Sequence, residues 1–180
     1  MRTIVTKLLI FIPLVAFELS AQVTWTANAT TAVPNFPSNG VVKTTTVDST
    51  VHGRGLRPLM TPNGFGTSLA YVPVTAPQGT QFACIGLRAA DASSSGSVMA
   101  EFLRQPRQAD PGPAVTMGSV TTTNAAGDGF QFVTAPFIAQ TIDYERYSYY
   151  VRIIFSYQGA ATAVIASPIA FDVSLRTTCQ

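Results

Sequence analysis

The side chains that could do acid-base or nucleophilic chemistry are few, and they exclude most reactions. The single histidine, His52, lies beside the turn at residues 53–55. A Ser-His-Asp triad needs this histidine to be oriented by a carboxylate and to contact a nucleophile. Asp48 is too distant from His52 along an extended strand, and the sequence has no Gly-x-Ser-x-Gly elbow. We therefore expect His52 to be a polar rim residue.

Metal ligands are equally sparse. A zinc site needs about three or four His, Cys or carboxylate ligands, and one histidine with two distant cysteines does not supply them. Calcium, which takes oxygen ligands, suits this sequence better than zinc, and Asp91 and Asp128 each lie in a loop rich in small residues. Ca²⁺ takes about six to eight oxygen ligands, and the usual cluster of aspartates is missing. We expect no cofactor, with Asp91 and Asp128 as weak calcium candidates.

Paired carboxylates could still support glycoside hydrolysis, because their separation is spatial rather than sequential. The candidates near expected strands are Glu101, Asp143, Glu145 and Asp172. We interpret them as solvated positions or turn caps and predict that the protein is not an enzyme. A glycosidase or lyase is the third alternative for its function.

Aromatic side chains are concentrated in "TIDYERYSYYVRIIFSY", residues 141–157. In one uninterrupted strand, the face directed to the core would carry Tyr147, Tyr149, Val151, Ile153, Phe155 and Tyr157. The other face would carry Ser148, Tyr150, Arg152, Ile154 and Ser156. Tyr150 with Arg152 is therefore the pair in this strand that we expect to contact a ligand or partner. The Asp143 to Tyr147 spacing also resembles the tyrosine corner of immunoglobulin-type sandwiches, with Tyr149 in place of the family's cysteine.

The chain begins like a secretory signal peptide. Arg2 and Lys7 precede an apolar run at residues 8–17, and small residues follow up to Ala21. A membrane anchor would need about 20 apolar residues, roughly twice this run, and a lipoprotein would need a cysteine directly after it. We expect residues 1–21 to be cleaved and the protein to be secreted, periplasmic or displayed at the cell surface, without membrane insertion.

Charge and composition describe the remaining chain. The full sequence has 11 basic and 9 acidic residues, and the cations are scattered, whereas a nucleic-acid partner needs a clustered basic face. No nucleic acid is expected. Residues 22–42 are interpreted as an extended or poorly ordered arm, in which Trp25 either docks on a neighbouring subunit or covers an edge of its own domain.

Residues 43–180 are rich in Thr, Ser and Val and are divided by Gly and Pro, which favours short strands joined by turns. We predict about eight strands and a single all-β domain, an antiparallel β-sandwich that is either jelly-roll or Ig-like. The segment 98–105 fits a strand or a short helix, and its context favours a strand. Cys84 and Cys179 either form a disulfide, which an oxidising compartment permits, or remain unpaired.

Two stretches, "PVTAPQGTQFACIGLRAAD" and "TIDYERYSYYVRI", resemble a group of uncharacterised secreted bacterial proteins. The positions that fall on the group's pattern are Pro77, Gly79, Asp91, Asp143, Tyr147, Tyr149, Tyr150 and Arg152. The resemblance implies an exported, compact β-sandwich, jelly-roll-like, without an assigned activity.

The absence of a catalytic motif leads to a prediction of a non-enzymatic structural or protein-interaction module, with self-association as one form. The alternative is an extracellular carbohydrate-binding module, for which Tyr150, Trp25 and Arg152 would provide the rings and the donor.

Overall fold

The computed structural model describes residues 22–34, 44–49, 53–58, 65–91, 96–108, 112–123, 129–158 and 168–179. The predicted signal peptide therefore lies outside the described residues. The described part contains eleven strands and one short 3-10 helix, Ala29–Thr31. The strands are β1 (Thr24–Asn28), β2 (Val33–Pro34), β3 (Thr44–Ser49), β4 (Gly53–Pro58), β5 (Phe65–Pro73), β6 (Gln81–Ala90), β7 (Ser97–Pro106), β8 (Val115–Thr121), β9 (Phe130–Thr141), β10 (Tyr147–Gln158) and β11 (Ile169–Arg176).

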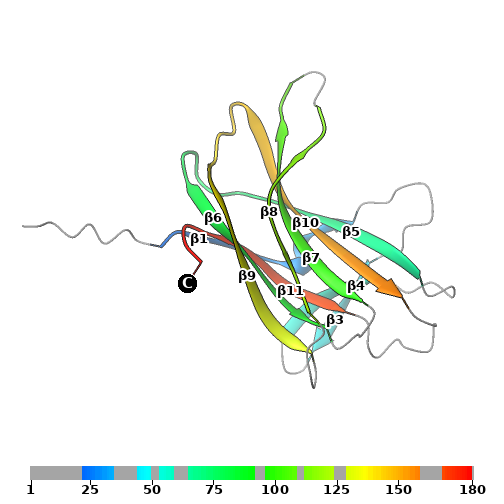
Figure 1. Ribbon diagram of the computed structural model, residues 1–180. Helices are drawn as coiled ribbons and strands as arrows, with labels where there is room; N and C mark the ends of the chain where they lie inside the picture. Colours follow the sequence, from blue (N-terminus) through cyan, green and yellow to red (C-terminus); the bar gives the residue numbers. More distant parts are fainter. Residues whose placement is uncertain are drawn as a thin grey trace, which may run out of the picture.

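The strands form two antiparallel sheets that pack face to face (Figure 1). Sheet A has the order β3-β4-β11-β6-β9, and β1 also pairs with β11; sheet B has the order β2-β5-β10-β7-β8. Without β1 to β3, the remaining strands form two four-stranded sheets, β4-β11-β6-β9 and β5-β10-β7-β8. This is the jelly-roll arrangement, so the topology resolves the choice between jelly roll and Ig-like sandwich that the sequence left open.

The eight strands expected from the sequence are all present, and the segment 98–105 is strand, within β7. Three further strands, β1, β2 and β4, were not expected. β4 contains Gly53, Gly55 and Pro58, residue types that are more common in turns than inside strands. Gly55 is buried against Ile169 and Phe171, where a Cβ would lie 2.5 Å from Ile169 Cγ2, so this glycine allows the strand to approach β11 closely.

The described part of the expected arm, residues 22–34, is extended and belongs to the sandwich. β1 pairs with β11 along Thr24 to Asn28, and β2 pairs with β5. Thr177 also donates its backbone N–H to the carbonyl of Val23 at 3.2 Å, so the first and last described segments lie side by side (Figure 1).

The core lies between the sheets and is built from side chains that alternate along the strands. Its fully buried large residues include Phe82, Ile85, Leu87, Phe102, Ile142, Ile153, Phe155 and Leu175. β6 lies between β11 and β9 in sheet A. No helix in the described ranges is long and apolar enough to span a membrane.

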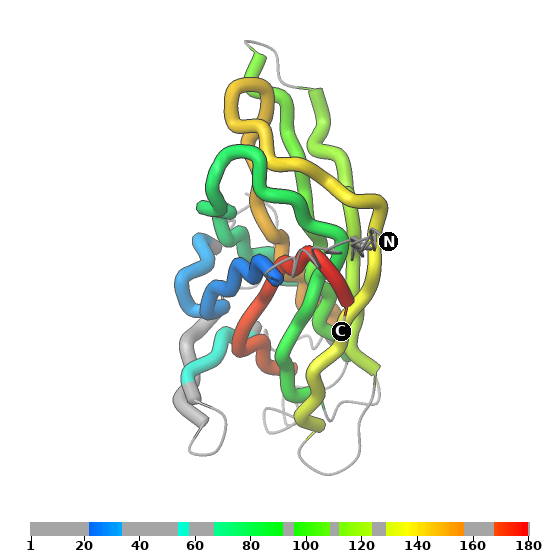
Figure 2. Tube along the Cα trace, turned by 90° about the vertical axis from the view of Figure 1, so that its left-hand side faces the viewer, coloured from blue at the N-terminus to red at the C-terminus, as the bar shows by residue number. Residues whose placement is uncertain are grey.

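β8 and β9, the edge strands of the two sheets, run side by side (Figure 2). The ring of Phe137 from β9 packs against Gly118 of β8 and lies 5.6 Å from the ring of Phe102. After Phe137 a bulge opposite Ala83 interrupts the alternation of β9.

Replacing Gly118 with alanine should destabilise the protein by about 1 to 3 kcal/mol, because the added Cβ would overpack this seam. That Cβ would lie 2.5 Å from Phe137 Cδ1 and 2.7 Å from its Cγ. The measurement is the free energy of unfolding in urea. Gly112→Ala is the matched control, because a Cβ at Gly112 meets nothing within 4 Å. Equal stability of the two variants would contradict the packing described here.

Candidate functional site

β10 divides the aromatic cluster between the core and the solvent as its parity predicts. Tyr149, Val151, Ile153 and Phe155 are buried, with Tyr149 3% exposed and the others fully buried. Tyr147 is half-buried and packs against the core, whereas the side chain of Tyr157 lies outside the described residues. The outward positions of β10 are exposed or half-buried, so the sequence-based assignment of its two faces is confirmed.

The outer face of sheet B brings together Tyr71, Glu101, Tyr150 and Arg152, which we name the tyrosine face. The rings of Tyr71 and Tyr150 meet edge to face with centroids 5.4 Å apart. Arg152 lies opposite Tyr71 on β5 and opposite Glu101 on β7. Its Nε donates to Glu101 Oε2 at 2.7 Å, and its Nη2 completes the ion pair. Tyr71 and Glu101 come from other strands, so only the sheet pairing identifies Tyr71 as the neighbour of Tyr150 and Glu101 as the partner of Arg152.

The electrostatics of the tyrosine face are balanced. Burial alone would lower the pKa of Arg152, but its hydrogen bond and charge attraction to Glu101 raise that pKa overall. Burial also raises the pKa of Tyr150, an effect that the charge of Tyr71 adds to and that of Arg152 opposes. At neutral pH the face therefore presents the protonated hydroxyl of Tyr150 beside one compensated ion pair. Such a surface can stack and hydrogen-bond a ligand.

Trp25 does not share this face. It lies on β1 in sheet A, where its indole packs against the core and its Nε1 donates to Thr75 Oγ1 at 3.4 Å. Trp25 was expected either to dock on a neighbouring subunit or to cover an edge of its own domain, and its position matches the second alternative. The tyrosine face thus joins Tyr150 with Arg152 but leaves Trp25 apart.

The two cysteines form a disulfide, Cys84 to Cys179, with their Cα atoms 5.2 Å apart. This confirms the paired alternative. The bridge attaches the segment after β11 to β6, and its Cys84 end is fully buried. Closing a loop of this length, with a sequence separation of 95, stabilises a fold by roughly 4 to 5 kcal/mol in the chain-entropy model.

The candidate ligands for metal and the candidate acids are placed apart. Asp91 is fully buried and accepts a hydrogen bond from Thr122 Oγ1 at 2.6 Å, while Asp128 and His52 lie outside the described residues. Within the described ranges, no group of three or more His, Cys, Asp or Glu residues could hold a metal ion. Glu101 and Asp172 lie on different sheets, and each is paired with an arginine.

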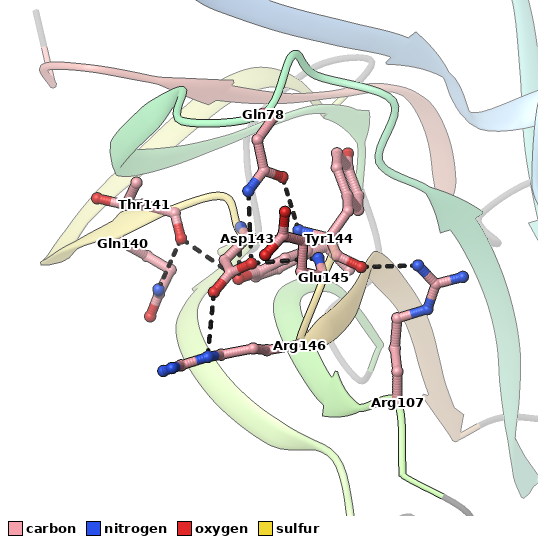
Figure 3. A network of polar contacts seen from close by, with 9 residues as sticks. Gln78, Arg107, Gln140, Thr141, Asp143, Tyr144, Glu145 and Arg146 are labelled. Carbon is pink, nitrogen blue, oxygen red and sulfur yellow. Dashed lines mark hydrogen bonds and ion pairs between the residues drawn. The ribbon is translucent and has the colours of Figure 1, made fainter.

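The turn between β9 and β10 is held by a polar network (Figure 3). Asp143 Oδ1 accepts the backbone N–H of Glu145 at 3.1 Å, and Gln78 Oε1 accepts that of Tyr144 at 2.8 Å. Arg107 Nη1 donates to the carbonyl of Tyr144 at 2.7 Å, on the opposite side of the turn from the ion pair of Arg146 with Asp143. These contacts fix the entry of β10 and therefore the register of Tyr150 and Arg152.

The corner tyrosine is Tyr149, which corrects the assignment of that role to Tyr147. The Tyr149 hydroxyl accepts the backbone N–H of Asp143 at 3.1 Å and donates to the carbonyl of Thr141 at 3.3 Å. Tyr147 instead donates its backbone N–H to the carbonyl of Asp143 at 3.0 Å, and its ring packs 4.4 Å from the guanidinium of Arg104. The prediction was wrong because spacing alone does not show which inward ring reaches back over the turn.

Tyr149→Phe should lower the free energy of unfolding by about 1 to 2 kcal/mol, because the backbone N–H of Asp143 and the carbonyl of Thr141 both lose the hydroxyl that they bond. Burial raises the pKa of Tyr149 above its ordinary value of 10.0, and the hydrogen bond from Asp143 opposes this shift. The stabilisation is fully present below pH 10 and is lost as pH rises through the folded-state pKa.

Urea unfolding from neutral pH to above pH 10 would test both effects. The loss of stability with rising pH should be shallower in Tyr149→Phe than in the unchanged protein. The control is Tyr147→Phe, because the hydroxyl of Tyr147 in the unchanged protein makes no hydrogen bond to the described residues. A Tyr147→Phe variant as unstable as Tyr149→Phe would be inconsistent with this assignment.

A second surface, on the outer side of sheet A, was not singled out from the sequence. It contains Arg88, Phe132, Asp172, Ser174 and Arg176, which we name the arginine face. Phe132 is 48% exposed, and the guanidinium of Arg176 lies 4.8 Å from its ring centroid. The alternation of Phe132 with the exposed Thr134 and Pro136 was the available signal, but it does not show which side of β9 faces solvent.

The fold and these two faces define a jelly-roll β-sandwich with charged and aromatic side chains on the outer face of each sheet. The sequence matches no protein-family model. A search of curated proteins also finds no match.

Solved structures do show the fold. The C-terminal CBM6 module of LamC, a marine laminarinase from Zobellia galactanivorans, superposes with a TM-score of 0.52 at 12% identity, covering 84% of this chain and 98% of that chain. The family 11 carbohydrate-binding module from Clostridium thermocellum, in complex with a mixed-linked tetrasaccharide, has a TM-score of 0.49 at 11% identity, with 88% and 91% covered. The CBM22-2 xylan-binding domain of Paenibacillus barcinonensis Xyn10C has a TM-score of 0.48 at 15% identity, with 86% and 99% covered.

Proposed function

We propose that this protein is an exported, non-catalytic carbohydrate-binding module that holds a neutral sugar on the tyrosine face. The observation that carries the proposal is the Tyr71 and Tyr150 ring pair directly beside the Arg152 and Glu101 ion pair, on the outer face of sheet B. A pyranose presents an apolar C–H face that stacks on a ring and hydroxyls that need donors and acceptors. The tyrosine face offers both in adjacent positions.

The charge of the face favours an uncharged sugar. Arg152 and Glu101 neutralise each other and are held in place, with side-chain exposures of 31% and 14%. A guanidinium and a carboxylate that are already ordered lose little conformational entropy when a ligand binds. The jelly-roll fold shared with the CBM6 module of LamC is consistent with this function, although the site carries the argument.

Export is part of the proposal. The N-terminal sequence has the layout of a signal peptide, and the disulfide between Cys84 and Cys179 fits an oxidising compartment. Soluble neutral polysaccharides in the surroundings of the cell are therefore the ligand class to test.

Isothermal titration with a β-1,3-glucan, a xylan and a mixed-linkage glucan would test the proposal. Tyr150→Ser should weaken binding of the preferred glycan roughly tenfold to thirtyfold, because it removes the central ring of the contact. Phe132→Ser removes a ring from the other sheet and should leave this affinity unchanged. Failure of the unchanged protein to bind any neutral glycan would refute the proposal, and full affinity in Tyr150→Ser would place the sugar elsewhere.

Self-association is a second candidate, and β9 is the observation that favours it. β9 is an edge strand of twelve residues without a charged side chain, and its Ile138 is 89% exposed. Edge strands without charges are prone to pair with another chain. Pairing of β9 with a second copy of the chain would make the protein a self-associating structural module.

Size-exclusion chromatography with light scattering would measure this association. We expect a concentration-dependent dimer that Ile138→Lys converts to monomer, since a charge on the edge opposes strand pairing. Thr134→Lys places the same charge on an exposed position of the same strand, and Arg57→Lys on β4 is the neutral control. A monomer at high concentration in the unchanged protein would end this candidate.

A further inference from the structure

We propose that the tyrosine face binds an internal segment of an extended, unbranched β-1,4-linked glycan, which lies across the strands of sheet B. This inference deepens the proposed function and rests on it, because it concerns the same face. It adds the shape of the ligand, its direction on the sheet and two contact residues on the edge strands.

A row of directly opposed residues crosses all five strands of sheet B, and we name it the cross-strand row. Arg152 of β10 lies opposite Tyr71 of β5 and Glu101 of β7. Tyr71 in turn lies opposite Val33 of β2, and Glu101 lies opposite Ser119 of β8. Directly opposed residues share one face of a sheet, so all five side chains belong to the outer face that carries Arg152. Neighbouring strands lie about 4.8 Å apart, so the row is about 19 Å long.

The length of the cross-strand row fits a chain of sugars rather than a single sugar. Each unit of an extended β-1,4-linked glycan advances the chain by about the spacing of two neighbouring strands, so the five strands offer about five successive positions. A β-1,3-linked glucan curves into a helix and would leave a straight row after a few units. The row therefore favours an extended backbone.

Both ends of the cross-strand row are exposed. Val33, on the edge strand β2, is 65% exposed, and Ser119 is exposed on the edge strand β8. A glycan that lies along the row can therefore continue past both edges of the sheet. Recognition of a chain end would need a wall at one end of the row, and these exposed side chains do not provide it. The arrangement favours an internal segment of the glycan.

The chemistry along the cross-strand row suits a neutral glycan. At its centre, the ion pair of Arg152 with Glu101 offers nitrogen donors and carboxylate acceptors in a fixed arrangement. The ring of Tyr71, beside this pair, offers an aromatic surface to the C–H face of one sugar unit. Ser119 adds a hydroxyl at one end of the row, and Val33 adds an apolar contact at the other.

The residues on either side of the row are aromatic or apolar. Two positions before Arg152 on β10, Tyr150 contacts the ring of Tyr71. Two positions after it, the half-buried Ile154 lies opposite Leu69 of β5 and Met99 of β7, which are also half-buried. A branch that pointed sideways from the glycan would place its hydroxyl groups against these aliphatic side chains, which is unfavourable. The sides of the row therefore favour an unbranched chain.

Isothermal titration with xylo-, manno-, cello- and laminari-oligosaccharides of two to six units would test the inference. For the preferred β-1,4-linked series, we expect the affinity to rise about tenfold from two units to five, because each added unit gains contacts along the row. The sixth unit should add little, since the row is then filled. Equal affinity for two and five units, or a preference for the laminari series, would overturn the inference.

Val33→Ser and Ser119→Ala change the two ends of the row. Each should weaken binding of the β-1,4-linked pentasaccharide about threefold and leave the affinity for the disaccharide unchanged, because a disaccharide occupies only the centre. Val115→Ser is the matched control, since Val115 is an exposed valine on the edge strand β8 that lies opposite Arg104, outside the row. It should change neither affinity. Full affinity for the pentasaccharide in both Val33→Ser and Ser119→Ala would overturn the inference.

Amide chemical shifts of the unchanged protein separate this inference from the proposed function. The pentasaccharide should shift residues 33, 71, 101, 119 and 152, whereas the disaccharide should shift residues 71, 101 and 152 but not 33 or 119. Shifts by the pentasaccharide confined to residues 71, 101 and 152 would overturn the inference and leave the proposed function standing. Absence of binding in every series would refute the proposed function and this inference with it.

Discussion

The packing of the two sheets through alternating side chains is the constraint on which the rest of the structure depends. Successive side chains of a strand point to opposite faces, so each residue buried in the core directs its neighbours outward. Burial of Val151 and Ile153 on β10 places Arg152 on the outer face of sheet B. Burial of Val173 and Leu175 on β11 places Ser174 and Arg176 on the outer face of sheet A in the same way. Both candidate faces are consequences of one core.

The two faces differ because their neighbouring strands supply different partners. β7 provides Glu101, which neutralises Arg152, whereas β9 opposes Arg88 with the uncharged Phe132. The outer face of sheet B therefore presents an ion pair beside tyrosine rings, whereas the outer face of sheet A presents a guanidinium against a phenylalanine ring.

The ends and edges of the sandwich are secured by contacts outside the core. The Tyr149 hydroxyl and the side chains of Gln78 and Asp143 order the turn before β10. The disulfide secures the segment after β11, and the ring of Phe137 on Gly118 closes the seam between β8 and β9. These contacts set the register of the strands that carry the two faces, so a change in any of them would reach the outer surfaces through the core.

The sequence by itself determined the features that follow from local periodicity and composition. The all-β class, eight strands and the two faces of β10 were all predicted, because alternation and turn residues are local signals. Only the tertiary structure decided the jelly-roll order, the strands β1, β2 and β4, and the tyrosine that forms the corner. It also decided which residues share a face: Tyr71 and Glu101 both lie opposite Arg152, and Arg176 lies against Phe132, although these residues are far apart in the chain. Periodicity along one strand carries no information on which strand lies beside it, and for that reason the partners of a site in a β-sandwich emerge only when the sheets are assembled.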